Sequence, residues 1–326
     1  MRDSENLFSV CFFDLDRFKN LNDSRGHDVG DKLLIALSGR INGILRSGDT
    51  LARMGGDEFI MLFNNLDGID GALNITERIL SSLQKPFEID NNQIYTNASF
   101  GLCMSAKEYT NSDDMIRDAD IAMYRAKSSG KNCIDVFNPD MHKYAFETMQ
   151  IENDLRLAIE KNQLEIYYQP VIDIINNRID GFEALLRWKH PSMGWVSPER
   201  FIPIAEHIGL INPLGQWVLE NACAQNCEWN KQFSPDNSFS IAINLSAIQL
   251  TEKDIHSTIK NVLDNTLMNP SKLHLEVTET ALINQKELAQ SSMEKIRQNG
   301  ISLSIDDFGK GYCSLTYLQE FDKSII

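Results

Sequence analysis

Carboxylates near the start of the chain have the types and spacing of a divalent-cation site. Asp14 ends the β-rich run 7–15, and Asp57 and Glu58 follow the Gly55-Gly56 step of a predicted hairpin. If the hairpin pairs beside the first strand, three carboxylates converge, and the glycines let backbone approach a phosphate closely. Clustered hard oxygens suit Mg²⁺ and would support nucleotidyl or phosphoryl transfer. The alternative is that Gly and Asp are present only because turns favour them.

A second set of acids and one amide falls at or just after predicted strand ends in the other half of the chain. In a βα barrel these ends open into one mouth, where crowded carboxylates bind a cation or acquire raised pKa values. Oxygen ligands without a histidine cluster favour Mg²⁺ or Mn²⁺ over Zn²⁺, and adjacent acids could bridge two ions for phosphodiester hydrolysis. The alternative is that these acids cap helices. The set is Glu183, Asn244, Glu276, Glu279, Asp306 and Asp307.

The first set requires an α/β unit of ordinary domain size to position it. Apolar residues at helical spacing alternate with β-rich runs along this half of the chain, as expected for mixed α/β structure. We expect strands at residues 7–15, 50–54, 58–63, 94–104 and 133–137, and helices at residues 29–45, 71–84 and 113–127.

The second set requires repeated strand-then-helix units after a break at Asn138-Pro139. We expect a first domain over 1–138, a linker-helix region over 139–150 within a polar helical stretch to about Lys161, and a second domain over 151–326. The pattern predicts a parallel sheet or barrel with its site at the strand ends. Its strands are expected at 164–172, 179–188, 239–245, 273–278 and 301–305, and its helices at 198–208, 214–230, 252–265 and 285–299.

The composition of the chain limits the classes of binding partner and indicates its cellular compartment. The 326 residues carry a formal net charge of −15, which argues against nucleic acid or an anionic membrane as the main partner. A phosphorylated small molecule remains possible where metal ions or local basic residues offset the charge. No stretch approaches a membrane span, and six scattered cysteines indicate reduced thiols in the cytoplasm. Cys223 and Cys227 could hold a metal, although buried thiols are the simpler interpretation.

The motifs around the first set resemble the GGDEF family of diguanylate cyclases. MGGDEF at 54–59 follows FFDLDRFKNLNDSRGHDVGDKLL and precedes YRAKSSGKN. The resemblance implies a palm-like α/β fold that joins two GTP molecules into cyclic di-GMP. It further implies Mg²⁺ on Asp14, the Leu15 carbonyl and Asp57, with Asp57 or Glu58 assisting deprotonation of the attacking ribose hydroxyl. For substrate binding it implies guanine contacts from Asn22 and Asp31 with His27 nearby, and phosphate contacts from Lys127 and Lys131.

Arg46 and Asp49 stand just upstream of the hairpin, spaced as in the inhibitory RxxD site of that family. Arginine can engage phosphate or guanine edges bidentately, and aspartate can accept from guanine N–H groups. The resemblance therefore implies a product-binding site that inhibits the cyclase. The alternative is a helix end followed by a turn.

The second half resembles the EAL family of cyclic di-GMP phosphodiesterases through YYQP, FEALLRW, FIPIAEHIGLI, NLS, LEVTET and IDDFGKGYCSL, in that order. The resemblance implies a TIM-like barrel with a first metal on Glu183, Asn244, Glu276 and Asp306, and a second on Asp307. Glu183 and Asp306 would be central to catalysis, and Glu279 would stabilise the loop after Asp306. Gln169 and Arg187 would contact substrate. Lys310 and Cys313 depart from the usual residues of that loop.

Compared with these families, the sequence lacks an initial helix and the last barrel strands, which include a catalytic lysine. We therefore expect a piece of a longer protein, truncated at both ends, with an incomplete barrel and without phosphodiesterase activity as it stands.

Three functions remain open at this level. The leading one is a bifunctional cytoplasmic enzyme, either free or the cytoplasmic portion of a membrane-anchored sensor, that makes and hydrolyses cyclic di-GMP with Mg²⁺ or Mn²⁺. It is expected to form a homodimer, because each cyclase domain would hold one GTP. In the second, one domain is catalytic and the other binds GTP or cyclic di-GMP as a regulator. The third is a non-catalytic cyclic di-GMP receptor.

Overall fold

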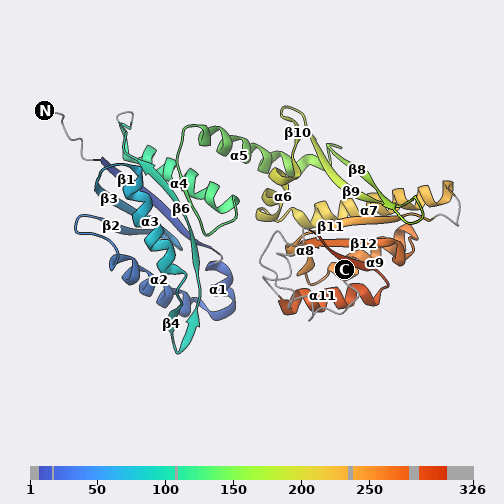
Figure 1. Cartoon of the computed structure of the whole chain (residues 1–326), viewed down its shortest axis with the longest axis horizontal. Coiled ribbons are helices and arrows are strands. Elements are labelled where there is room, and N and C mark those ends of the chain that lie inside the picture. The colour runs from blue at the N-terminus through green and yellow to red at the C-terminus, as the bar shows by residue number, and fades with distance from the viewer. Residues whose placement is uncertain (1–6, 17, 107–108, 234–237, 279–285, 307–326) are drawn as a thin grey trace. The chain divides into compact units, whose positions relative to one another are not determined.

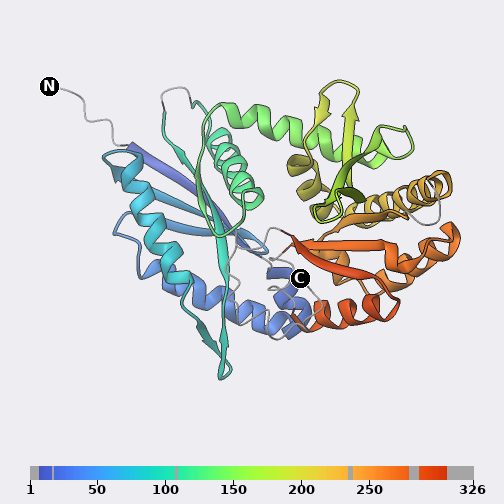
Figure 2. The same cartoon turned by 45° about the vertical axis from the view of Figure 1, so that its right-hand side comes forward.

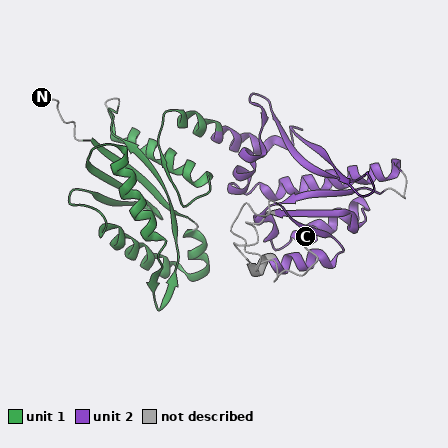
Figure 3. Cartoon of the chain, viewed as in Figure 1, with its two compact units in different colours: residues 1–147 green, residues 148–326 purple. Residues whose placement is uncertain are grey.

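The chain folds into two compact units, which Figure 3 shows in separate colours: unit 1 is Met1–Glu147 and unit 2 is Thr148–Ile326. The structure is a computed structural model that describes residues 7–16, 18–106, 109–233, 238–278 and 286–306. Both units mix helices with a sheet, which confirms the α/β class. Figure 1 traces the order of the elements along the chain. None of the described helices combines the length and the apolar character that crossing a membrane requires.

A sheet ordered β2-β3-β1-β6-β7 forms the centre of unit 1. Its middle strand, β1, pairs antiparallel with β3 on one side and with β6 on the other. The elements of this unit are β1 (Leu7–Asp16), α1 (Phe18–Arg25), α2 (His27–Asn42), β2 (Thr50–Gly55), β3 (Glu58–Leu66), α3 (Ile69–Leu83), β4 (Phe87–Ile89), β5 (Asn92–Ile94), β6 (Asn97–Met104), α4 (Ser112–Ser128) and β7 (Ile134–Val136).

Alternation along β1 divides the core of unit 1 between the two faces of the sheet. Cys11, Phe13 and Leu15 pack with α2 and α3, whereas Val10 and Phe12 pack with α4. Figure 2 shows α2 and α3 running along the sheet on the side away from α4. Asp14 has the parity of Val10 and Phe12, so it lies on the α4 face.

Helix α1, the β4–β5 hairpin and the start of β6 differ from the sequence prediction. Helix α1 was not predicted, because Phe18 alone of its residues is buried and no apolar stripe marks it. The strand predicted over 94–104 is shorter, since Ile94 belongs to β5, which pairs with β4 in a separate hairpin.

Helix α5 (Asp140–Ala158) continues from unit 1 into unit 2. The elements that follow are β8 (Leu164–Asp173), β9 (Arg178–His190), β10 (Gly194–Val196), α6 (Pro198–His207), α7 (Ile211–Gln232), β11 (Ser240–Leu245), α8 (Ala247–Leu250), α9 (Ile255–Thr266), η2 (Pro270–Lys272), β12 (Leu273–Thr278), α11 (Lys286–Gln298) and β13 (Ser302–Asp306).

The sheet of unit 2 is mixed, although the sequence predicted a parallel one. Strands β9, β11, β12 and β13 pair in parallel, as predicted. Strands β8 and β10, however, each pair antiparallel with β9. The turn between β8 and β9 has Asn177 in the left-handed region, at φ 48°, which favours a hairpin over a helical crossover.

The two faces of the parallel strands have opposite character. Ile241, Ile243, Leu275 and Val277 are buried in one apolar cluster, where they pack with α7 and α9. The alternate residues of the same strands form a polar face, and every one of the described metal-ligand candidates of this unit belongs to it. That face carries Glu183, Asn244, His274, Glu276, Ser302, Ser304 and Asp306.

Candidate functional sites

Pairing of β1 with β3 brings the carboxylates of unit 1 together. Asp14 is the direct partner of Glu58 in the antiparallel register, and Asp57 precedes Glu58 in the β2–β3 turn. Gly56 adopts φ 53° in that turn, a conformation that favours glycine. Its carbonyl accepts a 2.9 Å hydrogen bond from Arg53 Nε, which fixes the turn. The convergence that the sequence predicted for Asp14, Asp57 and Glu58 is therefore present.

Asp14 forms an ion pair that the sequence did not reveal. Lys127 Nζ of α4 lies 2.8 Å from Asp14 Oδ1, and both side chains are largely buried. Burial raises the pKa of Asp14 to about 6, Lys127 opposes this rise, and the charges of Asp57 and Glu58 add to it. Asp14 therefore holds its proton more tightly than a solvated aspartate does, even with an ammonium beside it. Leu15, whose carbonyl is a predicted metal ligand, has a fully buried side chain on the other face.

Asp120 and Asp16 also belong to this site, and sequence reasoning assigned neither a role. Asp120 precedes Lys127 by two helical turns on the same face of α4. Burial raises its pKa first, the charge of Glu58 adds to the rise, and Lys127 opposes it. Asp16 follows Asp14 by two residues on β1, and this spacing was the available signal that both share a face.

Asp16 holds the turn that contains Lys131. Its carboxylate accepts hydrogen bonds of 3.0 Å from Ser99 Oγ and from the backbone N–H of Asn132. Lys131 and Asn132 both have positive φ, at 64° and 50°, so the turn depends on such a restraint. Lys131 itself is exposed.

The predicted guanine contacts lie around the junction of α1 and α2. Asn22 Oδ1 is buried and has no hydrogen-bond partner within the described part of the chain. It faces Gly30, where an added Cβ would come within 2.0 Å of that oxygen, so glycine makes room for the amide. Asp31 and His27 are exposed residues of α2. Of these three residues, Asn22 is therefore the one whose buried acceptor oxygen has no hydrogen-bond donor within the described structure.

Asp49 already serves the turn that it occupies. Its two oxygens accept hydrogen bonds from the backbone N–H groups of Arg46, at 2.9 Å, and Asn64, at 3.1 Å. Arg46 is exposed. The turn interpretation of this pair therefore has direct support, and each Asp49 oxygen retains capacity for another donor.

In unit 2 the predicted residues of four strands, β9, β11, β12 and β13, converge. Asn244 Nδ2 donates a 2.9 Å hydrogen bond to Glu183 Oε1, and Asn244 is the register partner of Glu276. Burial raises the pKa of Glu276 to about 7, and the charges of Glu183 and Asp306 contribute to the rise. The crowding predicted from sequence is therefore present among these four residues.

Glu183 does not end its strand, contrary to the sequence prediction. It lies in the middle of β9, because that strand continues as the partner of β8 and β10. Only the segment from Gly181 to Ala184 pairs in parallel with β11. Glu183 is thus at the carboxyl end of the parallel-paired segment, which explains how it meets Asn244.

Gln169 and Arg187 both belong to the β8–β9 hairpin that contributes Glu183 to this cluster. Gln169 is the register partner of Glu183. Arg187 donates a 2.9 Å hydrogen bond to the Leu186 carbonyl, and its guanidinium carbon lies 5.8 Å from the centre of the Tyr167 ring. Arg187 and Asn244 also line a mainly apolar cavity of about 190 Å³ formed with residues of β9, α6 and α7.

The loop after Asn244 is fixed by a capping box. Ser246 Oγ accepts from the Gln249 backbone N–H, and Gln249 Oε1 accepts from that of Ser246 at 3.1 Å. Gly215 of α7 leaves room for the buried Gln249 amide, since an added Cβ would meet it at 1.8 Å. Two predicted site residues, Glu279 and Asp307, and the departures at Lys310 and Cys313 fall outside the described residues.

The donors of both clusters fit a hard divalent cation. They are carboxylate oxygens, an amide and a backbone carbonyl. Burial, with a further contribution from neighbouring carboxylates, raises the pKa values of Asp14 and Glu276. Among the residues described, no three His, Cys, Asp or Glu side chains already have the arrangement of a metal site. A cation would therefore have to draw the donors inward. Cys223 is buried, which raises its thiol pKa to about 12, as expected of a packed thiol.

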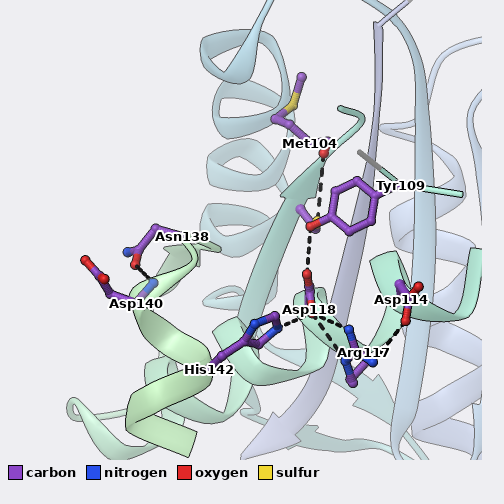
Figure 4. Close-up of polar contacts among 9 residues, drawn as sticks. Met104, Tyr109, Asp114, Arg117, Asp118, Asn138, Asp140 and His142 are labelled. Atoms are coloured by element: carbon purple, nitrogen blue, oxygen red, sulfur yellow. Dashed lines mark hydrogen bonds and ion pairs between the residues drawn. The ribbon is translucent and has the colours of Figure 1, made fainter. Parts of the chain in front are cut away.

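The opposite side of α4 holds the start of α5. Asp118 precedes Lys127 by nine positions, half a turn out of phase, and it is buried. Its carboxylate accepts hydrogen bonds of 2.7 Å from Tyr109 Oη and from His142 Nε2, and it pairs with Arg117 (Figure 4). The helix that contributes Lys127 to the site therefore also anchors the first turn of α5.

A second His–Asp pair holds the other end of α5 within unit 2. His190 is buried, and its Nδ1 accepts a 3.1 Å hydrogen bond from the backbone N–H of Met193. Its Nε2–H therefore donates to Asp154 Oδ2 of α5, at 2.8 Å. No sequence motif singled out these pairs.

Two family models match the chain. The EAL domain model matches residues 152–326, and the model described as "Diguanylate cyclase, GGDEF domain" matches residues 1–133. One match lies in unit 1 and the other in unit 2.

Curated relatives match nearly the whole chain. It is 38% identical over 317 residues to the bifunctional diguanylate cyclase/cyclic di-GMP phosphodiesterase MucR of Pseudomonas aeruginosa, covering 97% of this chain and 46% of that protein. It is 39% identical over 317 residues to the cyclic di-GMP phosphodiesterase PdeR of Escherichia coli, covering 97% of this chain and 47% of that one. The chain thus spans about half the length of the curated relatives it matches.

Among solved structures, the chain resembles the Vibrio cholerae LapD S helix-GGDEF-EAL structure bound to c-di-GMP. The TM-score is 0.62 at 20% identity, covering 96% of this chain and 73% of that one. At this identity the similarity concerns the fold alone.

Proposed function

Since the chain belongs to the family of proteins that carry a GGDEF domain followed by an EAL domain, we propose that the complete protein makes and hydrolyses cyclic di-GMP. Unit 1 would join two GTP molecules into cyclic di-GMP, and unit 2 would hydrolyse it to pGpG. The observation that carries the proposal is a separate carboxylate cluster in each unit, around Asp14 in the first and Glu276 in the second.

In unit 1, Asp14, Asp57 and the Leu15 carbonyl would hold Mg²⁺ or Mn²⁺. Asp57 or Glu58 would take the proton of the ribose hydroxyl whose oxygen attacks the α-phosphorus of the second GTP. A phosphodiester bond forms and pyrophosphate leaves. Lys127 and Lys131 would neutralise the phosphates, and the restraint of the 130–132 turn by Asp16 supports such a role for Lys131.

Guanine would bind where α1 meets α2. The buried Asn22 Oδ1 lacks a donor among its described neighbours, and guanine offers N–H donors on its Watson–Crick edge. Asp31 would accept from the same edge, with His27 nearby. Each such unit would hold one GTP, so the synthesis requires two units that face each other in a homodimer.

In unit 2, Glu183, Asn244, Glu276 and Asp306 would hold one cation and Asp307 a second. A water oxygen attacks the phosphorus, and the bond from phosphorus to the leaving ribose oxygen breaks, which opens the ring. Gln169 and Arg187 would contact the substrate, Arg187 through phosphate, and Glu279 would stabilise the loop that follows Asp306. Their positions along the hairpin beside Glu183 support this assignment for Gln169 and Arg187.

In both units the cations, when bound, would polarise phosphate oxygens and neutralise developing charge. In the absence of the cation, the pKa of Glu276 rises to about 7, so loading of unit 2 is expected to improve as the pH passes that value.

A second candidate keeps one activity and uses the other unit as a regulator that binds GTP or cyclic di-GMP. The relative PdeR favours this candidate, because it matches the chain over the same 317 residues as MucR does and is named for phosphodiesterase activity alone. The metal-ligand candidates found in both units favour the bifunctional form.

The test incubates the complete protein with Mg²⁺ and either GTP or cyclic di-GMP and separates the products by chromatography. GTP should yield cyclic di-GMP and pyrophosphate, and cyclic di-GMP should yield pGpG. Asp57→Ala should abolish only the first reaction and Glu183→Ala only the second.

Glu77→Ala and Glu228→Ala are matched controls, because they remove exposed carboxylates far from the clusters, on α3 and α7. Both controls should keep both reactions. If GTP is consumed but cyclic di-GMP is never formed, the cyclase assignment is wrong, and if Asp57→Ala affects only hydrolysis, the assignment of the two units is wrong.

A further inference from the structure

Among the described residues, the pair of Asp14 with Lys127 is the least exposed of the ion pairs that join lysine or arginine to an acid, and the pair of Arg125 with Asp135, at 38% and 19%, comes next. Asp14 has a side chain 12% exposed and Lys127 one 28% exposed, whereas the pair of Lys32 with Asp90 has side chains more than half exposed. An ammonium and a carboxylate withdrawn from water attract each other more strongly than a solvated surface pair does. The pair is therefore a defined part of the site.

Backbone packing fixes the position of Lys127 opposite Asp14. Helix α4 lies against β6 at Gly101, where an added Cβ would meet the Ala119 carbonyl oxygen at 2.0 Å and the Met123 nitrogen at 2.2 Å. β6 in turn pairs with β1, which carries Asp14. Because glycine permits this close approach, the last turn of α4 brings Lys127 to Asp14.

The same ammonium faces several carboxylates and balances only one. Glu58 and Asp57 raise the pKa of Asp14, and Glu58 raises that of Asp120, while Lys127 opposes both shifts. Within the described structure its ion pair is with Asp14, one of the two carboxylates that the proposed function assigns to Mg²⁺.

We propose that Lys127 acts as an internal counter-ion that takes the cation's position at Asp14 when no divalent cation is bound, and that it moves to the phosphates of the nucleotide when the divalent cation binds. This inference rests on the proposed function of unit 1. It assigns to Lys127 a role in cation affinity in addition to phosphate binding.

The consequence is a competition followed by an exchange of partners. A divalent cation must break the bond between Lys127 and Asp14 to reach the Asp14 oxygens, so it binds weakly without nucleotide. A triphosphate gives the displaced ammonium a new partner, so cation and nucleotide each strengthen the binding of the other. Without Lys127 the cation should bind Asp14 unopposed.

The experiment measures Mn²⁺ affinity without nucleotide from the electron paramagnetic resonance signal of free Mn²⁺. The complete protein carries Glu183→Ala and Glu276→Ala throughout, so that the second cluster does not contribute. In this background Lys127→Met should bind Mn²⁺ about tenfold more tightly than the parent, which corresponds to loss of a partly buried ion pair. Lys127→Gln should behave alike and covers the case in which the first variant does not fold.

Lys131→Met is the matched control, because it removes the same charge from an exposed position with no ion pair to an acid within the described structure. It should leave Mn²⁺ affinity unchanged. Both lysine variants should weaken GTP binding measured in EDTA, where the cation is absent.

The outcomes separate this inference from the proposed function. Unchanged or weaker Mn²⁺ binding in the Lys127 variants, with binding lost in Asp14→Ala, overturns the counter-ion and leaves the cyclase assignment standing. Unchanged Mn²⁺ binding in Asp14→Ala overturns the metal assignment of unit 1 and the counter-ion with it. An equal gain in Lys131→Met would show a general effect of net charge and would also overturn the counter-ion.

Discussion

The carboxylate clusters of the two units differ in what balances their charge. In unit 1, Lys127 bonds Asp14 and opposes the rise of its pKa, which still reaches about 6. In unit 2, the causes that shift Glu276 are burial and two further carboxylates, and its pKa reaches about 7. Within that cluster, the neutral amide of Asn244 donates a hydrogen bond to Glu183. In unit 1 the ammonium group of Lys127 therefore offsets part of the negative charge, whereas in unit 2 protonation of Glu276 offsets it.

The comparison teaches that two similar sets of candidate metal ligands can be stabilised differently when no metal ion is bound. A neighbouring ammonium favours the charged form of a carboxylate and so limits the rise in pKa that burial causes, whereas repulsion between carboxylates adds to that rise. Cation binding then displaces a lysine in one unit and protons in the other.

The largest expected effect is on catalysis. Asp14→Asn should lower cyclic di-GMP synthesis, and Glu276→Gln its hydrolysis, by at least about a hundredfold each, because each removes a charged ligand from a cluster that stabilises developing charge. Each variant should leave the other reaction unchanged. Product analysis of both reactions checks this. Loss of both reactions in one variant would show that the two clusters do not act as separate sites.

A smaller effect is expected on stability. Glu276→Gln should stabilise unit 2 by on the order of 2 kcal/mol at pH 8 in EDTA, and by nothing at pH 4. The raised pKa of Glu276 means that its contribution to stability is fully present below its usual 4.5 and is lost as the pH rises through about 7.

Calorimetric unfolding at the two pH values measures this difference, with the exposed Glu228→Gln on α7 as the control. The same gain at both pH values would mean that repulsion and burial of the charge are not its origin.

A third effect concerns product binding in unit 1. In a Glu183→Ala background, added cyclic di-GMP should inhibit GTP turnover, and Arg46→Ala should weaken the inhibition about tenfold through loss of a charged, bidentate contact. Synthesis rates at increasing cyclic di-GMP measure this. Equal inhibition of both proteins would mean that Arg46 and Asp49 stabilise the turn and do not bind the product.

The smallest effect is on metal-dependent stability. At pH 8 and without nucleotide, Mg²⁺ should raise the unfolding temperature of unit 2 by a few degrees, and that of unit 1 by less, since Lys127 competes for Asp14. Lys127→Met should bring unit 1 closer to unit 2 in this respect. Scanning calorimetry with and without Mg²⁺ measures both shifts in unfolding temperature. A larger shift in unit 1 than in unit 2 would contradict the competition between Lys127 and Mg²⁺ for Asp14.

Most elements could be predicted from sequence because their periodicity is strong. Strand β12 occupies Leu273–Thr278 as predicted, and α4 covers Ser112–Ser128 against a predicted 113–127. The failures have weak or ambiguous patterns: α1 buries only Phe18, and the hairpin of β8 with β9 has the same apolar runs as two parallel strands. Strand direction depends on the turn, which periodicity does not encode.

The candidate sites were predictable as far as they follow from strand order and pleat. Asp14 and Glu58 meet because adjacent antiparallel strands bring their register partners together. The bond from Lys127 to Asp14 depends instead on the close packing of α4 at Gly101, which joins residues far apart in the sequence. The hydrogen bonds that Asp49 accepts from the backbone likewise required the folded turn.

The course of α5 has a consequence for dissecting the protein. The division between the units, after Glu147, falls inside this helix. A first fragment that stopped at residue 138 would delete His142 and withdraw one donor from the buried Asp118 carboxylate. A second fragment that began after Asp154 would leave the buried imidazole of His190 without its acceptor. Isolated halves should therefore overlap, each retaining the entire helix, if they are to report faithfully on the parent molecule.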